Sequence, residues 1–264
     1  MIPTKPAAPS FDERSAPPLG GFNLTFLGIE IRRLLRNRRT VVVTLLVPAL
    51  AFFLFRTNKR LVALGGTEFA AASTMVGIAV YGAMLAATSG GAMVSIERSL
   101  GWSRQLRLTP LRPASYIAIK IAIAMLLGLT SVVVIYAMGA IDGVQMDLPA
   151  WLLTGLLAWV TSFDFAAFGL FMGYLLPSEN VMQVIGPVLA VFSLFGGLFV
   201  PVSLMPSTMQ VLAPWMPTYG IVEIARYPLL GGSFDPIWLL SVIVWTALFA
   251  TAAMLLFRRD TRRV

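Results

Sequence analysis

Hydrophobic residues gather in six stretches of this 264-residue chain, separated by segments rich in charge, proline or glycine. The stretches cover approximately residues 40–55, 69–95, 115–139, 150–176, 181–200 and 236–257. A transmembrane helix needs about 20 apolar residues to cross a hydrocarbon core of about 30 Å. The first stretch is shorter than this, so Arg56 must extend to the interface or the helix must continue towards Leu64. The pattern predicts an all-α integral membrane protein with six transmembrane helices.

Residues 22–38 predict an amphipathic helix at the membrane interface, with Arg32 and Arg36 roughly opposite an apolar stripe. The stripe consists of Leu24, Leu27, Ile31 and Leu34. Two interpretations stay open: a basic anchor held by anionic lipid, or a helix that docks a soluble partner. Residues 1–21 contain five prolines among small and polar residues, so we expect a disordered cytoplasmic leader there.

Two other polar segments differ from plain connections. Residues 97–108 predict a short helix that is stopped by Thr109-Pro110. Its mixture of apolar and basic residues suits docking to a soluble partner, and the alternative is a basic loop that fixes topology. Residues 201–235 are repeatedly interrupted by proline and predict re-entrant outer helices. Within this segment, Glu223 and Arg226 have the i,i+3 spacing that lets two side chains pair on one face of a helix. The segment is then either a structural cap or a ligand site.

Composition supports a membrane protein and excludes several chemistries. Hydrophobic residues make up 58% of the chain and charged residues 12%, whereas soluble domains carry about 25% charged residues. Neither a soluble enzyme domain nor a disordered protein fits these values. Without cysteine or histidine, the chain has no thiolate nucleophile, imidazole ligand or His-dependent triad, and no metal site is expected. The P-loop motif G-x-x-x-x-G-K-[ST] is also missing from the sequence.

Membrane topology explains the net charge of +8. Sixteen of the 20 basic residues lie in residues 1–39, 98–120 and 258–263. Basic residues favour cytoplasmic loops. Six spans therefore place both termini in the cytoplasm, and the charge needs no nucleic-acid partner.

Asp164 is the one acid deep within a predicted span. An acid at this depth is costly and must face protein or water. It either binds cargo or a coupling ion, or it hydrogen-bonds a neighbouring helix. On the same span, Gly169 and Gly173 form a GxxxG pattern, which indicates close helix packing.

Two loops carry a family resemblance. The first has the pattern E-R-x-x-G…L-x-x-T-P-L…K, formed by Glu97, Arg98, Gly101, Leu106, Thr109, Pro110, Leu111 and Lys120. The second is the run at residues 199–232, before the last stretch. From about residue 22 to the carboxyl terminus, the order and spacing of these features resemble the membrane permeases of type-2 ABC exporters. In that family the first loop is a coupling helix and the second is a re-entrant region.

The resemblance implies half of an ATP-driven exporter in a bacterial plasma membrane. Two permeases, identical or paired with a sister chain, would assemble with two separate ATP-binding subunits. Those subunits would hold ATP and Mg²⁺, and this chain would hold no cofactor. Contacts with them would come from the interfacial and coupling helices, at Glu30, Arg33, Glu97, Arg98, Gly101, Arg104, Thr109 and Pro110.

The resemblance also implies a cargo path between the second and fifth spans. Its predicted residues are Met75, Met84, Asp164, Phe192 and Phe195, with an outer gate at Glu223 and Arg226. Soft methionine and aromatic surfaces suit a hydrophobic or amphipathic cargo such as a drug, an antibiotic or a lipid. Ordinary packing within the bundle is the alternative for the methionine and phenylalanine side chains.

Two functions of other classes stay open. A membrane-embedded enzyme of lipid metabolism would need paired acids, or clustered acids that bind a metal ion. An ion-coupled carrier without an ATPase partner would need several buried charges or an internal repeat. Because the sequence shows none of these features, a transport subunit without catalytic residues is the main expectation.

Overall fold

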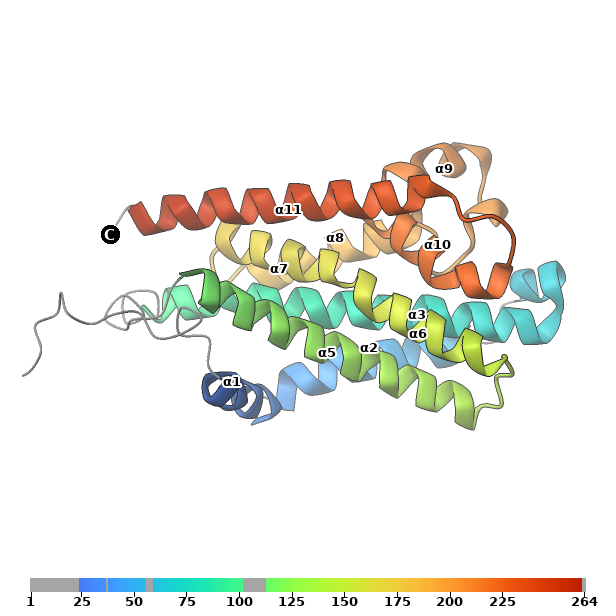
Figure 1. The fold of residues 1–264 in the computed structure, drawn as a ribbon, viewed down its shortest axis with the longest axis horizontal. Coiled ribbons are helices and arrows are strands. Elements are labelled where there is room, and N and C mark those ends of the chain that lie inside the picture. The colour runs from blue at the N-terminus through green and yellow to red at the C-terminus, as the bar shows by residue number, and fades with distance from the viewer. Residues whose placement is uncertain (1–23, 37, 56–58, 102–112, 263–264) are drawn as a thin grey trace, which may run out of the picture.

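The computed structural model describes residues 24–36, 38–55, 59–101 and 113–262. Within these ranges every regular element is a helix, and Figure 1 shows the helices as an elongated bundle. The elements in chain order are α1 (Leu24–Arg36), α2 (Arg38–Phe55), α3 (Lys59–Ser99), α5 (Pro113–Ile141), α6 (Leu148–Thr161), α7 (Phe163–Leu175), α8 (Val181–Phe195), η3 (Val202–Leu204), α9 (Ser207–Leu212), η4 (Ala213–Trp215), α10 (Pro217–Leu230) and α11 (Pro236–Arg262).

The described helices include four segments that are long and apolar enough to cross a membrane. They are Glu68–Ser99, Ala114–Ile141, Leu148–Leu175 and Pro236–Asp260. Two further apolar segments are shorter, Leu45–Phe55 in α2 and Val181–Phe195 in α8. The expected all-helical architecture is therefore found, and crossing of the membrane by all six segments stays a prediction.

The central helix α3 packs on α5 and α7 along much of its length and also contacts α2 and α10. Small residues let these backbones approach closely. A Cβ added to Gly169 of α7 would meet the backbone of Thr88, and one added to Gly173 would lie 3.2 Å from the Cα of Ala92. The GxxxG pattern thus packs α7 against α3 within this chain.

The fourth predicted span contains a break between α6 and α7. The hydroxyl of Ser162 donates to the carbonyl of Trp159 at 2.6 Å, and that of Thr161 donates to Leu157 at 2.6 Å. Such side-chain donors compete with the helical ladder and accompany bends. The break places Asp164 in the first turn of α7.

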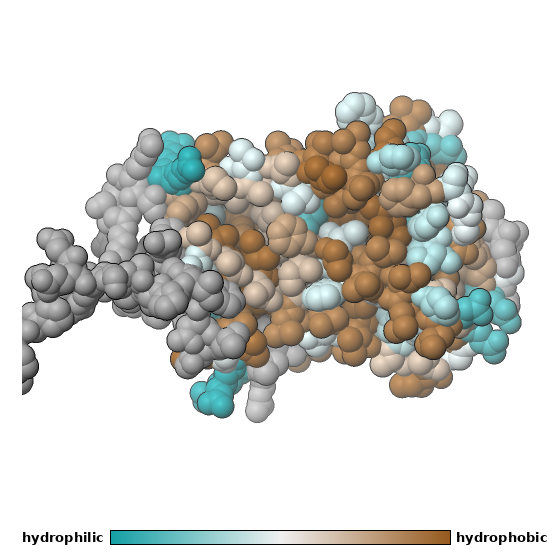
Figure 2. Space-filling model, in the orientation of Figure 1, coloured by the Kyte–Doolittle hydropathy of each residue, from teal (hydrophilic) through white to brown (hydrophobic). Residues whose placement is uncertain are grey.

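Apolar side chains cover the outside of the bundle. On the face shown in Figure 2, hydrophobic residues cover the middle of the molecule, and most hydrophilic residues lie towards its ends. Exposed large apolar residues from α2, α6, α8 and α11 include Leu54, Leu152, Val191, Leu240 and Leu255. An apolar outer surface of this kind is suited to contact with the lipid hydrocarbon of a membrane.

The two ends of the bundle differ in content. In Figure 1, α1, the end of α3 and the carboxyl-terminal end of α11 lie at one end, and α9 and α10 lie at the other. The short helices η3, α9, η4 and α10 occupy the segment at 201–235 in which re-entrant outer helices are expected.

Candidate coupling site at the end of α3

A buried ion pair joins helix α1 to helix α5. Glu30 is 6% exposed, although Gly28 and Ile29 beside it face outward. Its Oε2 accepts a hydrogen bond from Lys120 Nζ at 2.9 Å. The amphipathic helix therefore turns a carboxylate towards the bundle, where it meets a cation.

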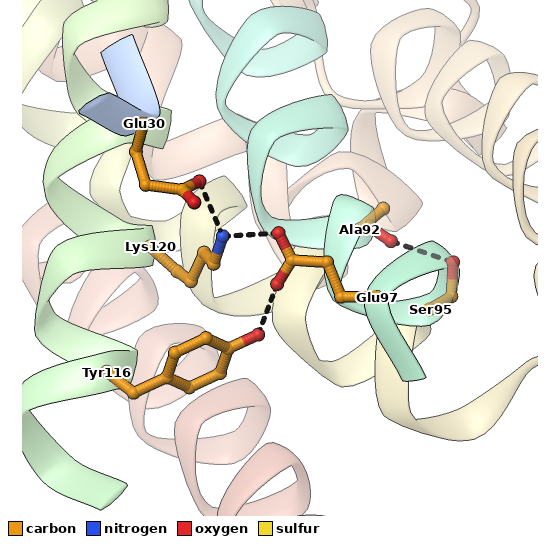
Figure 3. Close-up of polar contacts among 6 residues, drawn as sticks. All are labelled: Glu30, Ala92, Ser95, Glu97, Tyr116 and Lys120. Atoms are coloured by element: carbon orange, nitrogen blue, oxygen red, sulfur yellow. Dashed lines mark hydrogen bonds and ion pairs between the residues drawn. The ribbon is translucent and has the colours of Figure 1, made fainter. Parts of the chain in front are cut away.

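Lys120 is the centre of a buried group of polar side chains, shown in Figure 3 and called here the Lys120 cluster: Glu30, Glu97, Tyr116 and Lys120. The ammonium of Lys120 donates to Glu30 Oε2 and to Glu97 Oε1. Tyr116, one turn earlier on the same face of α5, donates its hydroxyl to Glu97 Oε2. Buried charges need pairing and hydrogen bonds to be stable. In this cluster the helices α1, α3 and α5 supply these ion-pair and hydrogen-bond partners to one another.

Arg98, the next residue on α3, forms a second junction. Its Nε and Nη2 donate to the two carboxylate oxygens of Asp260 on α11, at 3.2 and 2.7 Å. Its Nη1 donates to the carbonyl oxygens of Gly173 and Tyr174, each at 3.0 Å. The last carbonyls of a helix lack intrahelical partners and form the negative end of its dipole. One guanidinium therefore ties α3 to both α7 and α11.

The last turn of α3 thus connects to four other helices. Consecutive residues of an α-helix project about 100° apart, which directs Glu97 to α5 and Arg98 to α7 and α11. Lys120 of α5 extends the connection of Glu97 to Glu30 of α1. Beside Arg98 lies a cleft of about 570 Å³, whose lining includes Ser99, Glu179 and Asp260. Ion pairs and hydrogen bonds therefore hold the end of α3 to the ends of its neighbours.

Among the predicted coupling residues, Glu30 and Glu97 lie in the same cluster, and Arg98 points elsewhere. Because α3 ends at Ser99, Glu97 and Arg98 belong to the long helix and do not begin a separate helix at 97–108. Gly101 then turns the chain with a φ of +72°. The side chain of Arg33 and the residues Arg104, Thr109 and Pro110 lie outside the described part of the chain.

Sequence reasoning missed Tyr116 and Asp260, and it used Lys120 only as part of a motif. A lysine in an apolar helix costs about 2.5–3.5 kcal/mol at the membrane centre, so Lys120 did signal an acidic partner. Tyr116 and Asp260 carry no such signal, since their partners lie 19 and 162 residues away in the sequence.

The predicted cargo-path residues fall into two groups. Met75 and Met84 of α3 have no exposed surface and belong to the main hydrophobic core, as the packing alternative describes. Phe192 and Phe195 of α8 are half-buried, and Phe192 meets Phe168 edge to face at a centroid distance of 5.8 Å. Of these four side chains, only those of Phe192 and Phe195 on α8 have exposed surface that a cargo path requires.

Asp164 is fully buried and bonds to another helix. Its Oδ1 accepts a hydrogen bond from the hydroxyl of Thr246 on α11 at 3.1 Å. Its Oδ2 has no hydrogen-bond partner among the described residues. The contact with Thr246 is the neighbouring-helix bond that the sequence leaves as one alternative.

The expected pair of Glu223 and Arg226 is not formed in the described structure. Arg226 donates instead to the carbonyl oxygens of Gly197 and Leu198, beyond the end of α8. Burial raises the pKa of the half-buried Glu223 carboxyl, and the nearby charge of Arg226 lowers it to a smaller extent. The arginine therefore joins α10 to another part of the chain, and not to its own helix face.

Replacing Arg98 with glutamine is expected to lower the free energy of unfolding by about 2 kcal/mol, because each hydrogen bond to a charged group contributes about 1.5–3 kcal/mol. Titration with SDS in mixed micelles measures this change. Arg259→Gln is the matched control, since Arg259 is exposed on the same end of α11, and it should change stability by less than about 0.5 kcal/mol. Equal effects of the two substitutions would contradict the Arg98 junction.

Sequence relatives cover most of the chain, including Glu97, Arg98 and Lys120. Residues 55–258 match the family described as "ABC-2 family transporter protein". The chain is also 28% identical over 236 residues to the protein named "Putative transport permease YvfS" from Bacillus subtilis (strain 168). That alignment covers 88% of this chain and 95% of the relative. The chain therefore belongs to the ABC-2 family of transporter proteins.

Proposed function

We propose that this chain is the membrane permease subunit of an ATP-driven exporter. The observation that carries the proposal is the last turn of α3, shortly before residues 102–112. There Glu97 bonds to α5, and through Lys120 of α5 to α1, and Arg98 bonds to α7 and α11. In this proposal, a force applied to residues 102–112 acts on all four helices together. Membership of the ABC-2 family supports an ATP-binding subunit as the source of such a force.

In this proposal, two separate ATP-binding subunits hold ATP and Mg²⁺, since the chain lacks a P-loop. Two permease copies, identical or paired with a sister chain, enclose the cargo path. The interfacial helix α1 and the segment after α3 receive the movement of the ATP-binding subunits. The Lys120 cluster passes it to α5, and Arg98 passes it to α7 and α11.

The exporter lies in a bacterial plasma membrane, which it crosses six times with both termini in the cytoplasm. Two observations support this orientation: α1, the carboxyl-terminal end of α3 and that of α11 lie at one end of the bundle in Figure 1, and α1 and the end of α11 are basic. The cargo is hydrophobic or amphipathic, such as a drug, an antibiotic or a lipid. The half-buried aromatic side chains of Phe192 and Phe195 support this choice of cargo.

Inside-out membrane vesicles test the proposal. Vesicles that contain this chain and the ATP-binding subunit that copurifies with it should accumulate hydrophobic fluorescent dyes only in the presence of ATP and Mg²⁺. Omission of either subunit, or loss of the P-loop lysine of the ATP-binding subunit, should abolish accumulation. Uptake driven by a proton or sodium gradient without ATP would favour the ion-coupled carrier. Covalent change of the membrane lipids would favour the embedded enzyme, and either result contradicts the proposal.

A further inference from the structure

The cleft of about 570 Å³ beside Arg98 has no role in the proposed function. Its described lining comes from the end of α3, the connection between α7 and α8, and the end of α11. The volume lies within the range of about 300–1,000 Å³ that small-molecule sites have. Three of the candidate membrane spans end at residues of this lining, at Ser99, Leu175 and Asp260. The cleft therefore lies at one boundary of the apolar part of the bundle.

Most hydrogen-bond donors of the cleft are already engaged. Arg98 is the one cation among the lining residues that the structure describes. Four of its N–H groups donate to Asp260 and to two carbonyl oxygens of α7, which leaves one. Ser95 and Ser99 donate their hydroxyl protons to carbonyl oxygens of α3, at 2.9 and 2.8 Å. An anion in the cleft would therefore find few donors.

The acceptors of the cleft, by contrast, stay available and carry a net negative charge. The charge of Arg98 is matched by Asp260, so the carboxylate of Glu179 is left over. Glu179 is exposed and forms no ion pair within the described part of the chain. Arg258 and Arg259 of α11 do not line the cleft. Three helices, α3, α7 and α11, end beside it, whereas α8 begins there, so the helix dipoles add to the negative potential.

One wall of the cleft is apolar. Leu175, Leu176 and Pro177 line it, and Leu175 is 49% exposed. A purely polar ligand would leave this wall in contact with water. The lining therefore suits a ligand that joins a cationic donor to an apolar part.

We propose that the cleft binds the primary ammonium group of an amphipathic ligand, with Glu179 as its counter-ion. An ammonium group has three donors and no acceptor, which matches a cleft rich in free acceptors. The apolar part of the ligand lies against Leu175 and Leu176. Two kinds of molecule present this chemistry at a membrane surface: the ethanolamine headgroup of a phospholipid, and an amphipathic amine dissolved in water.

Dansylcadaverine, a fluorescent amphipathic primary amine, tests the proposal with the full chain in phosphatidylcholine nanodiscs. The protein should increase the dansyl fluorescence in a saturable manner. Glu179→Gln keeps the size of the side chain and should weaken binding about fivefold, the upper end of what an exposed ion pair contributes. Glu68→Gln is the matched control, since Glu68 is an exposed acid near the other end of α3, and it should leave the affinity unchanged.

Two further comparisons separate the cleft from the charge. Ser99→Phe fills the cleft without changing its charge and should weaken binding at least as much as Glu179→Gln. Ser207→Phe is its control, because Ser207 is exposed on α9 at the other end of the bundle. The N-acetylated probe lacks the ammonium group and should bind equally weakly to the parent and to Glu179→Gln. Size-exclusion chromatography checks that each variant is folded.

Replacing part of the phosphatidylcholine with phosphatidylethanolamine distinguishes the two sources of the ammonium. A phospholipid ligand should then compete with the probe in the parent and not in Glu179→Gln, whereas a soluble amine as ligand predicts no competition. Either result supports the ammonium site. Equal affinities of the parent, Glu179→Gln and Ser99→Phe, or undiminished binding of the acetylated probe, would overturn it. Because the measurement uses neither ATP nor an ATP-binding subunit, its result is independent of the vesicle experiment that tests export.

Discussion

Replacing Lys120 with methionine is expected to lower the free energy of unfolding by about 3–5 kcal/mol, the cost of removing one partner from a buried ion pair. Methionine keeps much of the length of the side chain. Glu30 and Glu97, however, then stay buried without the ammonium that both of them bind. Unfolding by SDS in mixed micelles, followed by tryptophan fluorescence, measures the change.

Two matched variants isolate the effect of charge at Lys120. Ala118→Met places the same side chain at an exposed position of α5 and should change stability by less than about 0.5 kcal/mol. Combining Lys120→Met with Glu30→Gln and Glu97→Gln should recover most of the loss, because neutral side chains can replace a buried ion pair at little cost. Parental stability of the single Lys120→Met variant would show that the cluster is not an ion-paired junction.

Gly169→Ala is expected to lower the free energy of unfolding by about 3 kcal/mol, the upper end of the range for overpacking. The added Cβ would lie 2.9 Å from both the C and the Cα of Thr88. Backbone atoms of a central packed helix cannot move aside as the end of a flexible side chain can. Loss of folded protein and a lower SDS midpoint are the measurements.

Other glycines provide a graded comparison for Gly169. At Gly173 the nearest atoms are 3.2 Å away, so Gly173→Ala should cost less. At Gly186 nothing lies within 4 Å. Because alanine favours a helix over glycine by about 1 kcal/mol, Gly186→Ala should not lower the free energy of unfolding. Equal losses at all three positions, or the reverse order, would contradict the close approach of α7 and α3.

The sequence predicts the long helices well because hydrophobicity acts locally. The stretches at 115–139, 150–176 and 236–257 coincide closely with α5, the pair α6–α7, and α11, whereas α3 contains the stretch at 69–95 but already begins at Lys59. The ends of helices are less predictable. Apolar residues continue to residue 200, yet α8 ends at Phe195, because Gly197 turns the chain and Arg226 of α10 satisfies the carbonyls there.

Charge patterning at the end of α3 predicts important residues without predicting their partners. From the sequence, Glu97 and Arg98 are expected to contact an ATP-binding subunit. In the structure they bond to Lys120 and Asp260 of the same chain. A sequence shows that a buried charge needs a partner, but the order in which the helices pack decides which helix supplies it.

The ion pair between Arg98 and Asp260 makes the thickness of the membrane relevant to the end of α3. The apolar stretch of α11 at residues 236–257 rises about 33 Å, whereas a hydrocarbon core measures about 30 Å. Such a helix fits by tilting, and Asp260 anchors one end of the tilt. We expect lipids with short acyl chains to increase the tilt and to load this anchor, and lipids with long chains to relieve it. We therefore expect the acyl-chain length of the surrounding lipid to change the strain on the ion pair between Arg98 and Asp260.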